Sequence, residues 1–255
     1  QVMHLFNTQA IHNGIRAAKG LSVKVVLYRG FAGHIQWYDP LSYMKYLHPR
    51  VDAIFCLSQG VEDYLKRQMV FVKNKTVTIN KGHNPDWYEY EPANIREELG
   101  ISKDALLLID VANNRKMKGI PYLMEAMNLL PKGLDIHVML VGRDMDTPEN
   151  RGILAKGAYA ENVHFLGFRD DVLNVVAASD LFVLPSIYGE AITKSVLEAM
   201  SIGVGAIISD ISGNVELVEQ GVNGLIFPSK NSQALADAML KVYENRELVK
   251  QFGDN

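Results

Sequence analysis

Two glutamates lie eight positions apart in one stretch of this chain, where a buried strand is expected to give way to a helix. The run 180–184 is short, continuous and apolar, which is typical of a strand buried on both faces. A helix that begins near Thr193 leaves Glu190 in the preceding loop and places Glu198 inside the helix. The first amides of a helix are unpaired and its dipole is positive at that end, which favours a bound phosphate. A carboxylate on each side of that phosphate would suit the hydroxyls of a sugar and a ribose.

A second candidate is the basic loop that follows the strand expected to end at Val111. It carries Arg115 and Lys118 and leads into a helix beginning near Ile120. Parallel sheets bind ligands beyond the carboxyl ends of their strands, which is where this loop lies. Arginine offers a planar fork of donors and lysine a point charge, so the pair suits a diphosphate. Taken alone, the loop is better explained as a solvated basic turn, and it is the nearby glutamate turn that makes a binding site the favoured interpretation.

The elements that position these residues follow an alternating pattern beyond about residue 93. Apolar runs rich in Val, Ile and Leu alternate with amphipathic segments, which predicts a doubly wound parallel sheet covered on both faces. We expect strands at 105–111, 136–141, 163–166, 180–184, 205–209 and 224–227. We expect helices at 120–130, 171–178, 193–202, 215–220 and 233–243.

The first part of the chain is less regular. It shows three clear strands, at 23–28, 51–57 and 76–79, and helical patterns at 6–18, 41–47 and 61–68. Turn formers and aromatic residues without helical or strand period occupy 81–88, which indicates a connection between domains. We therefore divide the chain into a partial α/β domain with this connection, residues 1–92, and a Rossmann-like domain, residues 93–255.

Composition excludes several classes of protein. A net charge of -3 and a pI near 6.2 give no electrostatic footprint for nucleic acid. The lone Cys56 lies in an apolar run and is expected to be a small buried residue in a reducing cytoplasm. Neither a membrane-spanning run nor a signal peptide is evident, and Asp39, Asp52 and Asp86 lack metal-ligand spacing. We expect a cytoplasmic protein without a metal ion or cofactor.

Three stretches resemble the glycosyltransferases of family four, the retaining group with the two-domain GT-B fold. Glu190 through Glu198 resembles the E-x7-E motif, and residues 115–119 resemble the R-x-x-K-G loop. Residues 212–224 resemble the segment that follows the E-x7-E motif, so the resemblance covers nearly all of 99–255. It implies an α/β, GT-B-like architecture of two Rossmann-like domains with parallel sheets, a nucleotide-sugar donor domain at 93–255 and an acceptor-side domain before it.

The resemblance also implies roles for individual residues. Arg115 and Lys118 would hold the donor diphosphate, with Glu190 on the transferred sugar and Glu198 on the ribose hydroxyls. The other donor contacts that it implies are the backbone of Ala191, Ile192 and Thr193 and, against the base, Gly167, Phe168 and Arg169. The implied reaction moves a sugar from a UDP-sugar or GDP-sugar to a carbohydrate or glycolipid acceptor. It keeps the anomeric configuration, needs no metal ion and belongs to cell-surface polysaccharide or glycoconjugate assembly.

The first half resembles a branch of the same family less specifically. Many members have a His-Gly pair where this chain has Arg29 and Gly30, so the acceptor-side histidine has no matching residue here. His34, four positions on, is a candidate substitute together with Arg29, although a loop histidine is more often a surface residue. Members also open with a strand and a glycine-rich loop that do not precede Gln1, so we expect an incomplete first domain. A partner chain or self-association would cover its exposed strand edge, and any membrane contact would be peripheral.

Two other functions stay open at this point. The alternatives to a glycosyltransferase are a non-catalytic sugar-nucleotide-binding subunit and a GT-B sugar-nucleotide epimerase or hydrolase. Glycosyl product made by this chain alone would exclude the first alternative, and conversion of the donor without an acceptor would indicate the second.

Overall fold

The computed structural model describes residues 1–69 and 74–255, which form two compact units. One unit consists of residues 1–82 together with 189–192, and the other of residues 83–188 and 193–255. Each unit contains one parallel sheet, as the sequence predicted. The connection 83–92 groups with the second unit.

The sheet of the first unit has four parallel strands in the order β1-β2-β3-β4. The strands are β1 (Val2–Leu5), β2 (Lys24–Arg29), β3 (Val51–Cys56) and β4 (Thr76–Thr78). The helices are α1 (Thr8–Ala17), α2 (Pro40–Tyr46) and α3 (Gln59–Gln68). Each helix is preceded by a residue whose side chain accepts a hydrogen bond from a backbone N–H, which satisfies one amide of the first turn. These residues are Asn7, Asp39 and Ser58.

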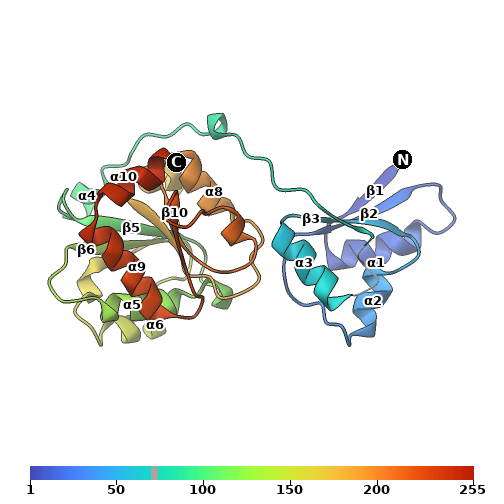
Figure 1. The fold of residues 1–255 in the computed structure, drawn as a ribbon, viewed down its shortest axis with the longest axis horizontal. Coiled ribbons are helices and arrows are strands. Elements are labelled where there is room, and N and C mark those ends of the chain that lie inside the picture. The colour runs from blue at the N-terminus through green and yellow to red at the C-terminus, as the bar shows by residue number, and fades with distance from the viewer. Residues whose placement is uncertain (70–73) are drawn as a thin grey trace. The chain divides into compact units, whose positions relative to one another are not determined.

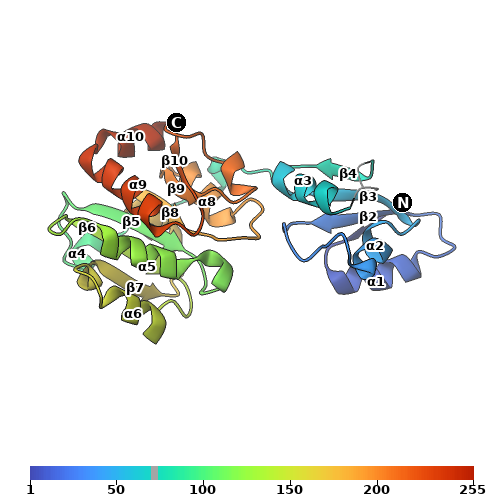
Figure 2. The ribbon, with the colours of Figure 1, turned by 60° about the horizontal axis from the view of Figure 1, so that its bottom comes forward.

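The sheet of the second unit has six parallel strands in the order β10-β9-β8-β5-β6-β7 (Figure 2). The strands are β5 (Leu106–Val111), β6 (Ile136–Val141), β7 (Val163–Gly167), β8 (Leu181–Leu184), β9 (Ala206–Ser209) and β10 (Gly224–Phe227). The α-helices are α4 (Ile95–Glu98), α5 (Ile120–Leu129), α6 (Pro148–Leu154), α7 (Val172–Ala177), α8 (Lys194–Ser201), α9 (Ser232–Glu244) and α10 (Glu247–Asp254). Short 3-10 helices occupy Pro85–Trp87, Lys116–Lys118, Ala160–Asn162 and Asn214–Glu216.

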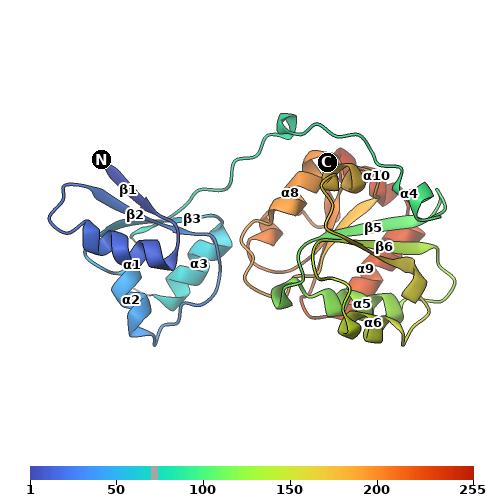
Figure 3. The ribbon, with the colours of Figure 1, turned by 180° about the vertical axis from the view of Figure 1, so that it is seen from behind.

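Both faces of this second sheet are covered, which explains why its strands are apolar at nearly every position. Leu106 and Leu108 of β5 pack into a core with α5, α6 and α9, whereas Leu107 and Ile109 pack into a core with α4, α7 and α8. Figures 1 and 3 show α5, α6 and α9 on one side of β5 and β6 and α8 on the other. The predicted doubly wound parallel sheet is confirmed.

Several elements differ from the sequence expectation. A fourth strand, β1, precedes α1 in the first unit, where the sequence showed only three. The helix expected at 215–220 is wrong, because only the 3-10 turn Asn214–Glu216 forms between Gly213 and Gly221, which both have positive φ angles. The helices α4, α6 and α10 were not predicted. The first two have four and seven residues, too short for a helical period to show.

Candidate functional site

The basic loop leaves β5 at its carboxyl end and is held tightly against the segment that follows β8. Gly119 has a φ angle of +68°, and a Cβ atom at this position would lie 2.0 Å from the carbonyl oxygen of Pro185. The N–H of Ile187 donates a hydrogen bond of 2.8 Å to the carbonyl oxygen of Met117. The backbone of the loop is therefore fixed to the segment that leads toward α8, and only glycine fits at the contact.

The cations of this loop are differently exposed. Arg115 is exposed and lines a hollow of about 630 Å³ together with residues of α5 and α6. Lys118 is half-buried and does not line that hollow. Both residues belong to the second unit and lie in one loop between β5 and α5.

The start of α8 has two buried polar groups that lack partners among residues 1–69 and 74–255. Thr193 precedes the helix with an extended backbone, and its N–H donates to Oδ1 of Asn214 at 3.1 Å. Thr193 is 7% exposed and Asn214 is fully buried. Within the part of the chain that the structure describes, the Thr193 hydroxyl and Nδ2 of Asn214 have no hydrogen-bond partner. Unpartnered donors are costly when buried, so a pair of them beside a helix N-terminus indicates a missing acceptor such as an anion.

Glu198 lies in the second turn of α8, as predicted, and its side chain is 17% exposed. Its Oε1 accepts a hydrogen bond from the Lys194 ammonium and a longer one, 3.5 Å, from the Tyr88 hydroxyl. The hydrogen bond to Glu198 raises the pKa of Lys194. Burial, and then the charge of Glu198, raise the pKa of Tyr88. The carboxylate is thus fixed in position by two donors.

Glu190 lies in the loop before α8, as predicted, and is buried with 9% exposure. The segment 189–192 groups with the first unit, so Glu190, Ala191 and Ile192 belong to one unit, and Arg115 and Thr193 to the other. Gly189 has a φ angle of +79°, which turns the chain at the start of this segment. The joint role expected of Glu190, Arg115 and Lys118 stays a prediction.

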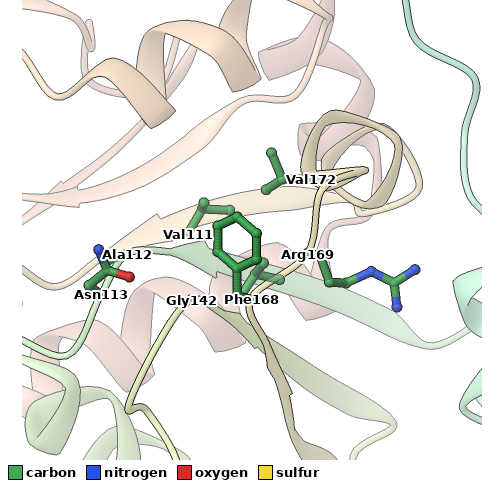
Figure 4. Close-up of a pocket in the computed structure, with 8 residues that line it drawn as sticks. Val111, Ala112, Asn113, Gly142, Phe168, Arg169 and Val172 are labelled. Carbon is green, nitrogen blue, oxygen red and sulfur yellow. The ribbon is translucent and has the colours of Figure 1, made fainter.

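A pocket of about 180 Å³ lies at the carboxyl ends of β5, β6 and β7 (Figure 4). Its lining residues are Val111, Ala112, Asn113, Val141, Gly142, Phe168, Arg169 and Val172. The Phe168 ring is 61% exposed, and the Arg143 guanidinium lies 5.0 Å from its centroid. Gly167, with a φ angle of +65°, turns the chain into this pocket but does not line it. An apolar pocket with an exposed ring and a nearby cation can hold a flat heterocycle.

Arg169 reaches the same pocket, but its guanidinium is bonded elsewhere. It donates to both carboxylate oxygens of Asp171 at 2.8 Å and to Glu98 at 3.0 Å. These hydrogen bonds, that to Asp171 first, raise the pKa of Arg169. Figure 4 shows the side chain of Arg169 running away from Phe168. The aliphatic part of the Arg169 side chain is therefore the part that can contact a ligand in this pocket.

Sequence reasoning missed the backbone that shapes this pocket. Gly142 follows β6 with a φ angle of +143°, and a Cβ atom there would lie 1.7 Å from the carbonyl oxygen of Ala112. The N–H of Arg143 donates to Oδ1 of Asn113 at 3.1 Å. A glycine directly after a predicted strand, at the ligand-binding edge of the sheet, was the signal that could have found these residues.

In the first unit, Arg29 and His34 have different environments. The Arg29 guanidinium donates to the Tyr46 hydroxyl at 3.1 Å and to the carbonyl oxygen of Gly33, and it lines a hollow of about 310 Å³ beyond β1 and β2. His34 is exposed, has a φ angle of +56° and stacks on Phe31 with ring centroids 5.2 Å apart. His34 does not line that hollow, so Arg29 is the better placed of the two for an acceptor.

Residues 1–69 and 74–255 lack two kinds of feature. They contain no group of three or more His, Cys, Asp or Glu side chains arranged to hold a metal ion. Their helices are all too short or too polar to cross a membrane.

Comparison with known proteins gave a family and a fold. The sequence model of the family glycosyl transferases group 1 matches residues 92–255. The N-acetyl-alpha-D-glucosaminyl L-malate synthase of Bacillus anthracis is 30% identical over 171 residues, which are 66% of this chain and 44% of that protein. The N,N'-diacetylbacillosaminyl-diphospho-undecaprenol alpha-1,3-N-acetylgalactosaminyltransferase of Campylobacter jejuni is 32% identical over 178 residues, 68% of this chain and 45% of its own length. This chain thus spans less than half the length of either relative.

The likeness to solved structures extends over both units. The crystal structure of Anabaena Alr3699/HepE in complex with UDP-glucose matches with a TM-score of 0.83 and 20% identity, and the match covers 99% of this chain and 72% of that one. The predicted GT-B fold class is thereby confirmed.

Proposed function

This chain belongs to the glycosyl transferases of group 1, and from that membership we propose that it transfers a sugar from a nucleoside-diphosphate sugar to an acceptor hydroxyl with retention of the anomeric configuration. The observation that carries the proposal is the start of α8, where the Thr193 hydroxyl and Nδ2 of Asn214 are buried without partners in the described residues. The distal phosphate of the donor supplies the acceptor that these groups lack.

Stabilisation of the leaving diphosphate is the centre of the reaction. Negative charge grows on the diphosphate as the glycosidic bond breaks. The first amides of α8, Arg115 and Lys118 meet that charge, and the hydrogen bond between Ile187 and Met117 keeps the basic loop in place. Because these groups are fixed before the reaction, little reorganisation is needed in the transition state. They supply the neutralisation that a divalent cation would otherwise give, so we assign no metal to the reaction.

The nucleoside occupies the remaining donor contacts. The base lies on the Phe168 ring in the pocket beyond β5 and β6, and the ribose hydroxyls donate to Glu198 beside Lys194. Glu190 fixes the transferred sugar and favours its oxocarbenium character. The backbone of Ala191 and Ile192 completes the contacts to the sugar and the distal phosphate.

The donor that we favour carries UDP. The structure with TM-score 0.83 is a complex with UDP-glucose, and GDP is the alternative donor base. The acceptor is a carbohydrate or glycolipid, in line with the undecaprenol-linked acceptor in the name of the Campylobacter relative. We assign the reaction to the cytoplasm and to cell-surface polysaccharide or glycoconjugate assembly. Retention is supported by the alpha linkage in the names of both relatives.

Turnover by the purified chain tests this proposal. The chain is incubated with UDP-hexoses, UDP-N-acetylhexosamines and GDP-mannose together with sugar and lipid-linked acceptors. Product is measured by mass spectrometry and its anomeric configuration by NMR. We expect a glycoside of retained configuration, and Glu190→Gln should lower kcat by roughly 100-fold with little change in KM, as for a lost transition-state contact. Glu244→Gln, an exposed glutamate at the end of α9, is the matched control and should leave both constants unchanged.

Each of the other outcomes overturns the proposal. Nucleotide binding without turnover would indicate a binding subunit. Release of nucleotide without glycoside would indicate a hydrolase, and interconversion of donor sugars an epimerase. An inverted product would refute retention.

A further inference from the structure

Large apolar side chains are exposed around α2 of the first unit. Leu41 and Met44 are 60% and 67% exposed and lie three positions apart, on one face of the helix. Trp37 and Tyr38, in the segment just before α2, are 67% and 64% exposed, and their rings meet edge to face with centroids 5.7 Å apart. Four exposed apolar side chains of this size within residues 37–44 are more than the scattered exposure that soluble proteins show.

Basic side chains from α1 and α2 lie beside this apolar cluster. His12 and Arg16 of α1 and Lys45 of α2 line a hollow of about 180 Å³ together with Leu41 and Met44. The other described residues that line it are Ile15 and His48, so none of the described lining residues carries a carboxylate. We call Trp37, Tyr38, Leu41, Met44, Arg16 and Lys45 the α1–α2 patch.

Carboxylates are scarce in the first 50 residues of the chain, which include α1 and α2. Residues 1–50 contain six Lys or Arg residues and one carboxylate, Asp39, which gives a net charge of +5. The whole chain has a net charge of -3, so the remaining 205 residues carry -8. Such asymmetry selects an anionic partner for the first unit and repels it from the rest of the chain.

The form of the patch favours a lipid surface over an acidic peptide or a small anion. Leu41 and Met44 line the hollow beside its cations, and a small anion would leave these apolar side chains exposed. Tryptophan and tyrosine concentrate at membrane interfaces because their rings are apolar at one end and polar at the other. Apolar residues flanked by Lys and Arg are the combination by which peripheral proteins bind anionic lipid.

We propose that the α1–α2 patch docks this protein peripherally on a membrane that contains anionic phospholipid. Trp37 and Tyr38 lie at the level of the headgroups, and Leu41 and Met44 enter the acyl boundary. Arg16 and Lys45 contact lipid phosphates. This inference does not depend on the proposed activity, because its test measures binding alone.

Vesicle binding tests the proposal with the full chain. Co-sedimentation is measured with vesicles of phosphatidylcholine alone and with vesicles that also contain phosphatidylglycerol, at low and high salt. We expect binding to the anionic vesicles at least tenfold tighter than to the neutral ones, and its loss at high salt. Each basic residue near a surface contributes about fivefold, so Arg16→Glu with Lys45→Glu should weaken binding by about 25-fold or more. Leu41→Ser with Met44→Ser should weaken it about tenfold.

Matched variants in the second unit separate this patch from general charge. Lys103→Glu with Lys132→Glu makes the same change of net charge at two exposed lysines, and Leu129→Ser removes an exposed leucine. We expect vesicle binding within twofold of the unaltered chain for both, and circular dichroism verifies folding of every variant. Equal binding to neutral and anionic vesicles, no binding, or equal losses in the control variants would overturn the proposal. Binding of polyglutamate without binding of vesicles would indicate an acidic protein partner instead.

Discussion

Gly119 holds the basic loop against the segment after β8, and replacing it by alanine should loosen that contact. The glycine has a φ angle of +68°, and its missing Cβ would lie 2.0 Å from a backbone oxygen, that of Pro185. Backbone cannot move aside as the end of a flexible side chain can. The loop that carries Arg115 and Lys118 must therefore shift in Gly119→Ala.

The chain contains an internal reference for this substitution. Gly100 has a φ angle of +67° but no atom within 4 Å of an added Cβ. Alanine in the left-handed region costs about 1 kcal/mol at either site. At Gly119 the overlap adds about 1–3 kcal/mol, and loss of the hydrogen bond from Ile187 to Met117 adds about 1 kcal/mol. We expect the free energy of unfolding to fall by about 1 kcal/mol in Gly100→Ala and about 3–5 kcal/mol in Gly119→Ala.

Urea denaturation followed by circular dichroism measures both losses, and calorimetry measures UDP affinity. Gly119→Ala should bind UDP at least tenfold more weakly, whereas Gly100→Ala should bind it normally, because only the former moves the basic loop. Equal losses of stability in the two variants would refute the assigned packing. If Gly119→Ala loses the expected stability but binds UDP with normal affinity, the link between the loop and the diphosphate is refuted.

Three further predictions concern stability and reactivity. Burial, and then the charge of His137, lower the pKa of His164 below its ordinary 6.5. The unfolded chain therefore binds this proton more readily than the folded chain does. As a result, the free energy of unfolding should fall as the pH drops below about 6.5. Urea midpoints at pH 7.5 and 5.5 should differ less in His164→Gln, and an unchanged difference would contradict this. Burial raises the pKa of Cys56 to about 12, so a disulfide reagent at pH 8 should modify this thiol only after the chain unfolds. Rapid reaction of the folded chain would contradict this prediction. Asp180 accepts from the Leu107 amide at 2.7 Å and from Arg96 at 2.9 Å, so Asp180→Ala should lower the free energy of unfolding by about 2 kcal/mol, and a loss below 0.5 kcal/mol would contradict that role.

The second unit could be predicted from the sequence in most of its elements. Its strands are buried on both faces, so each is a continuous apolar run, and β6 and β10 match the expected bounds. The parallel order then brings the loops after β5 and β8 to one edge of the sheet. The apolar run of β8 and the helical pattern after it place Glu190 in the loop and Glu198 in the helix, and both positions are confirmed.

What the sequence did not predict depends on contacts made in three dimensions. Strand β1 has one buried residue, Leu5, and forms through its pairing with β2 rather than through its own pattern. The Thr193 hydroxyl and Nδ2 of Asn214, which have no partner in the part of the chain that the structure describes, come together only because positions 21 residues apart meet in the fold. The fit of Gly142 against Ala112 likewise depends on two neighbouring strands.

Calorimetric titration of UDP into this chain and into Glu198→Gln tests the central claim, that a nucleotide-sugar donor binds at α8, most directly. Hydrogen bonds to a charged group contribute about 1.5–3 kcal/mol, so the substitution should weaken binding by roughly tenfold or more. The control Glu244→Gln should bind as the unaltered chain does. Absence of binding by the unaltered chain to both UDP and GDP, or equal affinities for the unaltered chain and Glu198→Gln, would contradict the claim.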